Sequence, residues 1–190
     1  MKNVFFIMLG VALFGCGNIT PTPKPVGYFR IDIPEYGFSE TRPETCPFSF
    51  PLSEMARVEF SSRENLNKCW FNLSYPGFDA RVHFTYREVD ENLRELIEES
   101  RLLTYEHQVK ATRINEQAFS DVEDSVYGLM YTLGGDVASP LQFYLTDSTN
   151  HFLRGALYFN ARPNPDSIAP VLIQIENDLH RFTEDFKWLD

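Results

Sequence analysis

Three residues in the C-terminal half are those of a serine hydrolase triad: Asp147, Ser148 and His151. In such a triad the imidazole takes the proton of the serine hydroxyl, and the carboxylate orients the imidazole. These three residues, however, lie close together on a predicted tight turn between two strands. Asp and Ser side chains in turns hydrogen-bond to the nearby backbone. We therefore expect them to shape the turn, and we assign no catalytic residue.

The four histidines are far apart in the sequence: His83, His107, His151 and His180. Only His83 and His151 are expected to approach each other in a sheet, and one pair completes neither a zinc site nor a triad. The sequence also lacks phosphate-loop, zinc-protease, nucleophile-elbow and dinucleotide-binding motifs. We therefore predict no metal, no cofactor and no enzymatic activity.

Two other function classes stay open as alternatives. A hydrolase acting on envelope polysaccharide needs two facing carboxylates, for which the sequence offers Glu88 with Asp90, or Asp121 with Asp124. Nothing in the sequence fixes their separation. A periplasmic ligand-binding lipoprotein needs a sizeable apolar pocket between sheet and helix. A deep cleft with paired carboxylates would favour the first alternative, and such a pocket the second.

Cys16 stands where a thiol can be modified. Lys2 is followed by an uncharged apolar run, Val4 to Phe14, which is shorter than the roughly 20 residues that cross a bilayer and typical of a cleaved export signal. Leu13-Phe14-Gly15-Cys16 resembles the lipobox of bacterial lipoproteins, in which the cysteine is acylated and becomes the N-terminus. Phe14 departs from that pattern, since a small residue is usual there, and an ordinary signal peptide is the alternative.

Cys46 and Cys69 remain once Cys16 carries lipid. An even pair in an exported domain predicts one disulfide, which would close a loop of about 23 residues and contribute roughly 3 kcal/mol in the chain-entropy model. Two buried thiols are the alternative. Metal binding is disfavoured because neither a CxxC motif nor a nearby histidine accompanies the pair.

Arg154 is a cation in an otherwise apolar stretch, His151–Phe159. Alternation along the predicted strands places it on the same face as other polar and aromatic residues, Gln142 among them. Arginine and tyrosine are enriched in binding hot spots, and an arginine paired with a sheet carboxylate or carbonyl is the structural alternative. The candidate partner-binding residues are Arg81, His83, Arg87, Tyr144, Arg154 and Tyr158.

The elements that must position these residues are mainly strands. Residues 26–56 are expected to be irregular, with short strand-like pieces such as Tyr28–Ile33. A hairpin with one wet side is predicted over 69–86, then a helix from an Asp90 cap to about His107. The remaining predicted elements are a short strand within 108–123, strands over 126–133, 138–146 and 152–159, and a final helix over 168–186 capped by Asp166-Ser167.

This order predicts a single α+β domain with a mostly antiparallel sheet of about five to seven strands and two main helices packed on it. By analogy, the architecture is of the Mog1/PsbP-like kind. Three alternate prolines in Thr20–Pro25 favour an extended tether, on the order of 28 Å from Gly17 to Pro25. The predicted parts are a signal peptide (1–15), a lipidated cysteine with its Pro-rich tether (16–27) and a globular domain (28–190).

Composition excludes one class of partner. The protein has 190 residues and a formal net charge of −10, so it is repelled by phosphate, and we expect neither nucleic acid nor direct docking on anionic lipid. The 17 Phe, 9 Tyr and 2 Trp suit a sheet-rich core.

The residues after Cys16 indicate which way the domain faces. In related bacteria, surface-exposed lipoproteins carry an acidic run after the lipidated cysteine. No acidic run follows Cys16 in this sequence, so we expect the domain to face the periplasm.

Several segments resemble the gliding motility lipoprotein GldD family over about residues 25–187. They include GYFRID (27–32), CPFSF (46–50), CWFN (69–72) and, most specifically, TDSTNHFLRGALYF (146–159). The resemblance implies a lipid-anchored accessory protein of surface gliding and type IX secretion, beside membrane-embedded envelope partners. The family has no assigned catalytic residues, so none is carried over.

Three triplets share the form Asp-Ser followed by an aliphatic residue or Thr: Asp124-Ser125-Val126, Asp147-Ser148-Thr149 and Asp166-Ser167-Ile168. They resemble an O-glycosylation sequon of exported proteins in some anaerobic and gliding bacteria, which makes Ser125, Ser148 and Ser167 candidate glycan sites. Asp-Ser pairs also initiate turns and cap helices. Because all three lie at predicted element boundaries, this alternative stays open.

Acylation at Cys16 predicts where the mature protein begins and where it is found. Mass spectrometry of the N-terminal peptide should identify an acylated Cys16, and the protein should fractionate with membranes until detergent is added. A mature form that begins elsewhere and is recovered in the soluble fraction would contradict the lipobox assignment.

Overall fold

The computed structural model describes residues 36–160 and 165–189. The predicted signal peptide, Cys16, the tether and the strand-like piece Tyr28–Ile33 all lie outside the described residues. The described residues form a single α+β domain built on a seven-stranded antiparallel sheet of order β3-β4-β5-β9-β8-β7-β6. A second sheet has three strands in the order β1-β2-β10. The fold class predicted from the sequence is confirmed.

The strands of the large sheet are mostly joined by short turns. They are β3 (Arg57–Glu59), β4 (Phe71–Tyr75), β5 (Ala80–Glu88), β6 (Ala111–Asp121), β7 (Val126–Gly135), β8 (Leu141–Thr146) and β9 (His151–Phe159). The small sheet contains β1 (Phe38–Thr41), β2 (Phe48–Ser53) and β10 (Lys187–Trp188). The helices are α2 (Arg63–Asn67), α3 (Leu93–Tyr105) and α4 (Pro165–Glu184), with two 3-10 turns at Pro76–Phe78 and Glu106–Val109.

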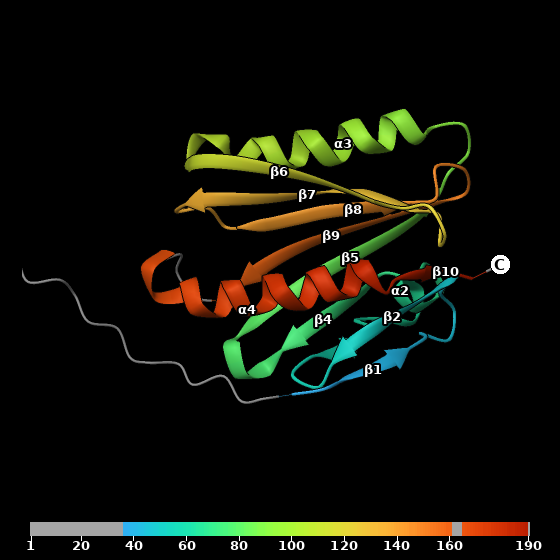
Figure 1. The fold of residues 1–190 in the computed structure, drawn as a ribbon, viewed down its shortest axis with the longest axis horizontal. Coiled ribbons are helices and arrows are strands. Elements are labelled where there is room, and N and C mark those ends of the chain that lie inside the picture. Colours follow the sequence, from blue (N-terminus) through green and yellow to red (C-terminus); the bar gives the residue numbers. More distant parts are fainter. Residues whose placement is uncertain (1–35, 161–164, 190) are drawn as a thin grey trace, which may run out of the picture.

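The two long helices pack on opposite faces of the large sheet (Figure 1). On one face the Thr104 hydroxyl of α3 lies 3.3 Å from Oε1 of Gln142 on β8. On the other face the Thr132 hydroxyl of β7 donates to Glu176 of α4 at 3.1 Å. The small sheet lies beside α4 and shares its face, since β2 contributes Phe50 to the same core.

The core lies between α4, the small sheet and the large sheet. Phe71 of β4 stacks on Phe84 of β5 with ring centroids 4.6 Å apart, and on Phe50 of β2 at 5.7 Å. Phe182 of α4 then contacts Phe84 at 5.2 Å. These rings come from four elements, so their burial ties both sheets to α4.

The start of the described domain is attached to α4 by a polar contact. The Tyr36 hydroxyl donates to the buried carboxylate of Asp178 at 2.5 Å, and Gln174 hydrogen-bonds to both groups. Burial raises the pKa of the Asp178 carboxyl, although the hydroxyls of Tyr36, Ser53 and Tyr75 oppose that shift. These contacts hold Tyr36, the first described residue, against α4.

Cys46 and Cys69 form a disulfide, with Cα atoms 5.4 Å apart. Residues 26–56, expected to be irregular, contain β1 and β2, and Pro51 lies within β2. No helix in the described parts of the protein has the length and apolarity needed to cross a membrane.

Three further expectations were wrong in detail. The short strand expected within 108–123 is the eleven-residue β6, because it pairs with β7 along almost its whole length and its polar side chains suit an edge. Helix α3 is preceded by Asn92, not by an Asp90 cap. Helix α4 begins at Pro165, so Asp166-Ser167 lies inside it, and Pro170 lies beyond its first turn.

Gly155 and Gly77 provide a matched pair for testing the packing of the core. A Cβ at Gly155 would overlap the ring of Phe143, which is fully buried against Phe84 and Phe182, whereas a Cβ at Gly77 would meet nothing within 4 Å. We expect Gly155→Ala to lower the free energy of unfolding by about 1–3 kcal/mol. Gly77→Ala should change it by less than about 0.5 kcal/mol. Equal effects in urea denaturation would contradict this packing.

Candidate functional site

The residues predicted to form a basic and aromatic surface do share one face of the large sheet. The strand register places Arg81 opposite Tyr158, and Arg154 opposite both Thr85 and Tyr144. The hairpin β4–β5 keeps this face open to solvent, as predicted. Where α3 crosses β8 and β9 the face is no longer open to solvent, and Phe152 and Gln142 are only 3% and 1% exposed. The predicted surface is therefore divided by the edge of α3.

The open part of the face contains Arg81, His83 and Tyr158. Arg81 pairs with Glu59 of β3 at 3.6 Å, with both side chains about half exposed. The ring of His83 meets that of Tyr158 edge-on at 5.4 Å. Burial first, and the nearby Arg81 charge second, lower the pKa of His83. A hollow beside them has a volume of only about 120 Å³, which is small for a drug-sized ligand.

The edge of α3 bounds a larger opening, which we call the α3 groove, with a volume of about 460 Å³. One wall is a single face of α3, at helical spacing from Leu96 to Leu103. The floor comes from β5 and β9, and Trp70 closes one end. The lining residues are Trp70, Thr85, Arg87, Leu96, Glu99, Ser100, Leu103, Phe152 and Arg154.

Arg154 lies on the floor of the α3 groove without a carboxylate of its own. Its Nη2 donates to Oε1 of Gln142 at 2.5 Å, and its buried Nε has no hydrogen-bond partner among the described residues. Burial lowers the pKa of Arg154, which the nearby Tyr158 and Glu99 partly offset. An arginine remains protonated in proteins despite such a shift. The groove therefore holds a partly desolvated cation.

The other cation of the groove is already paired. Nη1 of Arg87 on β5 donates to Oε2 of Glu99 on α3 at 2.7 Å, and both side chains are about half exposed. This pair spans the gap between sheet and helix. With Arg154 added, the lining of the groove has two cations and one anion, a net charge of +1.

Trp70 is positioned by the short segment that precedes β4. Ser62 caps α2 by accepting from the Asn65 N–H at 3.1 Å, and the helix ends at a turn in which Cys69 has a positive φ of 55°. That backbone conformation is unfavourable for a residue other than glycine. The disulfide to Cys46 lies at this turn, so the cross-link supports the conformation that aims Trp70.

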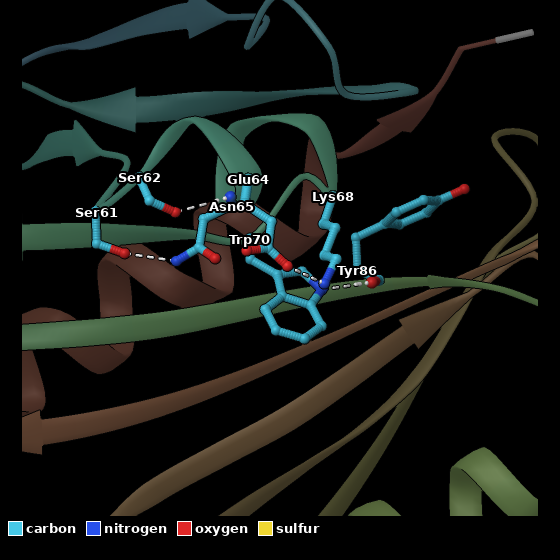
Figure 2. A network of polar contacts seen from close by, with 7 residues as sticks. All are labelled: Ser61, Ser62, Glu64, Asn65, Lys68, Trp70 and Tyr86. Atoms are coloured by element: carbon cyan, nitrogen blue, oxygen red, sulfur yellow. Dashed lines mark hydrogen bonds and ion pairs between the residues drawn. The ribbon is translucent and has the colours of Figure 1, made fainter.

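Figure 2 shows how polar contacts hold the indole. Trp70 Nε1 donates to the backbone carbonyl of Tyr86 at 2.9 Å. The ammonium of Lys68 lies 5.1 Å from the centre of the Trp70 ring and pairs with Glu64 at 2.6 Å. Trp70 and Arg87 also line a second hollow, of about 470 Å³, which lies towards the disulfide. The indole therefore stands between two openings.

The triad-like residues are committed to other contacts. Oδ1 of Asp147 accepts from the backbone N–H groups of Thr149, Asn150 and His151 at 2.8–3.0 Å. The ring of His151 is turned elsewhere, hydrogen-bonded through Nδ1 to the Tyr86 hydroxyl at 2.7 Å and stacked on Trp188 at 5.0 Å. Asp147 therefore shapes the turn.

His83 and His151 do not approach each other, which corrects the expectation from the sequence. The register pairs His83 with Ala156, and His151 with Glu88. The two histidines are therefore separated by five positions along paired strands, roughly 16 Å. Because side chains alternate along a strand, they also lie on opposite faces.

Of the two carboxylate pairs considered for a hydrolase, Asp121 with Asp124 belongs to a turn. Oδ1 of Asp121 accepts from the backbone N–H groups of Glu123 and Asp124 at 2.9 and 3.1 Å, which closes the turn between β6 and β7. Within residues 36–160 and 165–189, no group of three or more His, Cys, Asp and Glu side chains could hold a metal ion.

The Asp-Ser triplets lie at element boundaries. Ser125 and Ser148 are exposed in turns and have positive φ values of 52° and 71°. Ser167 lies in the first turn of α4. Both exposed serines are accessible to a modifying enzyme. A structural role in the turns is an equally good explanation for the Asp-Ser pairs at these positions. Glycosylation of Ser125, Ser148 and Ser167 stays a prediction.

Sequence reasoning did not assign the walls of the groove. Trp70 was noted only within a segment that resembles the family. Its position directly after Cys69, and the fact that the sequence has only two tryptophans, could have marked it as a candidate site residue. Glu99 and Leu103 gave no signal, because their role follows from where α3 crosses β9. Gln142 was expected on the face, yet its function as the hydrogen-bond acceptor for Arg154 depends on burial that only the fold provides.

The geometry of the Asp147 turn predicts a pH-dependent contribution to stability. Burial alone would raise the pKa of this carboxyl, but the three backbone N–H groups and the Thr149 hydroxyl lower it below the ordinary 3.8. Asp147 therefore stabilises the fold above its unfolded pKa, and this contribution is lost as the pH falls through the folded pKa. Asp147→Ala should cost roughly 1–3 kcal/mol at pH 7 and much less near pH 2, measured by urea unfolding. A cost independent of pH would contradict this role.

Comparison with known proteins adds a family to this geometry. The family model described as "Gliding motility lipoprotein GldD" matches residues 18–188. No curated protein sequence matches this one. Among solved structures, the protein is similar to the solution structure of cyanobacterial PsbP (CyanoP) from Synechocystis sp. PCC 6803, with 11% identity and a TM-score of 0.47, covering 93% of this protein and 99% of that one.

That protein is a PsbP, and the architecture named by analogy from the sequence is the Mog1/PsbP-like one. The family match covers nearly the whole sequence after Cys16 and includes every described element. The resemblance found in the sequence is confirmed. The chain belongs to the gliding motility lipoprotein GldD family.

Proposed function

We propose that this protein is a lipid-anchored, non-enzymatic accessory component of the gliding motility and type IX secretion machinery, acting through protein–protein contacts in the cell envelope. Family membership implies an accessory role in gliding motility and association with the envelope. The finer parts of the proposal are the lipid on Cys16, the absence of catalysis and the contact surface. They are supported by separate observations.

The observation that carries the contact function is the α3 groove with Arg154, whose direct hydrogen bond is to Gln142 and not to a carboxylate. The opening combines aromatic and aliphatic walls with one cation in excess, in a protein whose formal net charge is −10. Arg and Trp in a partly desolvated pocket are typical of the anchors that dominate protein–protein binding. The structural alternative, an arginine paired with a carboxylate or a carbonyl, accounts for only part of the guanidinium, since Nη2 donates to the side-chain carbonyl of Gln142 while Nε has no partner among the described residues.

The arrangement of the polar residues favours contact over catalysis. His151 is bonded to Tyr86 and stacked on Trp188, and Asp147 accepts three backbone N–H groups. Neither residue is oriented towards Ser148. The groove itself is lined by the single carboxylate Glu99, which is paired with Arg87, whereas glycoside hydrolysis uses two.

The anchor and the domain would act together. Acyl chains at Cys16 attach the protein to one membrane, and the tether allows the domain to reach envelope partners. The hydrogen bond between Tyr36 and Asp178 attaches the first described residue to α4. We infer that the domain faces the periplasm.

Complementation of a deletion strain of the source bacterium separates these claims. The exported Cys16→Ser variant should fail to restore colony spreading and type IX secretion, because the domain is no longer held beside its partners. Ser148→Ala and His151→Gln, at matched protein levels, should restore both to wild-type levels. Loss of function in either of these two variants, with folding intact, would favour an enzyme.

A further inference from the structure

Arg154, on the floor of the α3 groove, and its buried neighbour Gln142, which does not line the groove, each have one hydrogen-bond donor that lacks an acceptor. Arg154 Nε and Gln142 Nε2 are both buried and have no hydrogen-bond partner among the described residues. The two side chains contact each other through Nη2 and Oε1. Leaving such groups unsatisfied costs free energy, more when the group is charged. Nε itself is buried, but Arg154 lines the groove, and an acceptor with negative charge placed there would best stabilise the charge of its guanidinium.

The charge of the groove limits what that acceptor can be. Arg87 is neutralised by Glu99, which leaves one positive charge, on Arg154. One carboxylate matches this charge, whereas a phosphate dianion or a polyanion would leave excess negative charge in an acidic domain. The segment that carries the carboxylate must also bring apolar groups, because Leu103 and Trp70 line the groove together with Arg154.

We propose that the α3 groove binds a peptide segment of a partner protein through a carboxylate placed on Arg154, with neighbouring apolar side chains packed against Leu103 and Trp70. The carboxylate belongs to an Asp or Glu side chain or to the C-terminus of the partner. The guanidinium fork can present two N–H groups to such a carboxylate. This proposal rests on the proposed function, since it names the chemistry of the protein contact.

The test uses the full-length, anchored protein in its own cells, with the photocrosslinking residue p-benzoylphenylalanine in place of Leu103, which is 38% exposed on the wall of the groove. Mass spectrometry of the adduct should identify a partner segment with an Asp, a Glu or the partner's C-terminus within about five residues of the link. Arg154→Met, which retains an apolar stem, should reduce the adduct at least tenfold, because loss of one member of a buried charge pair weakens a complex by more than that.

Matched variants make the result specific. Arg101→Met removes a cation from α3 itself but outside the groove, where Arg101 pairs with Glu98 at 3.8 Å, and should leave the adduct unchanged. Thr85→Glu places a carboxylate opposite Arg154 in the strand register and should reduce the adduct even if Arg154→Met does not fold. Glu99→Gln releases Arg87 and should increase the adduct.

Several results would overturn the proposal: no adduct, an adduct with lipid or glycan, an adduct with a second copy of this protein, a linked segment without a carboxylate, or an adduct that persists undiminished in the folded Arg154→Met and Thr85→Glu variants. A carboxylate-bearing segment from a protein unrelated to gliding or secretion would instead support the groove chemistry and contradict the proposed function. The two failures are therefore distinguishable.

Discussion

The width of the large sheet is the constraint on which the rest of the structure depends. Seven strands span roughly 29 Å, whereas one helix covers about 10–12 Å. On one face, α4 is assisted by the small sheet, and together they bury the aromatic core around Phe71 and Phe84. On the other face, α3 is the one long helix among the described residues. It covers β8 and β9 and leaves β4 and β5 open, so a boundary between dry and wet sheet runs along β9.

Arg154 lies at that boundary, which gives its charge an unusual setting. Its neighbours across the sheet are Thr85 on the open side and Tyr144 on the covered side. The aliphatic part of the side chain can be buried while the guanidinium stays near the groove. Trp70 also lines the groove at this boundary. The disulfide-linked turn before β4 places its indole beside β5, where Nε1 donates to the backbone carbonyl of Tyr86.

The sequence predicted what alternation and composition encode. The hairpin 69–86, the strands after it, the α+β class and the pairing of Cys46 with Cys69 follow from period-two patterns and from cysteine count. The long β6 was underestimated because an edge strand needs no apolar alternation. The division of the polar face was not predictable, since the position at which α3 crosses the sheet depends on tertiary packing of Leu96, Ser100 and Thr104, not on local pattern.

The central claim is that the described face beside α3 is occupied by a partner when the protein is anchored in the envelope. Hydrogen exchange measured on the protein in native membranes, and again on the purified domain, tests it most directly. The account predicts slower exchange in membranes for amides of α3 and of β5 beside the groove, with little change in β6 and α4. Equal exchange beside the groove in both preparations, or protection confined to other elements, would contradict it.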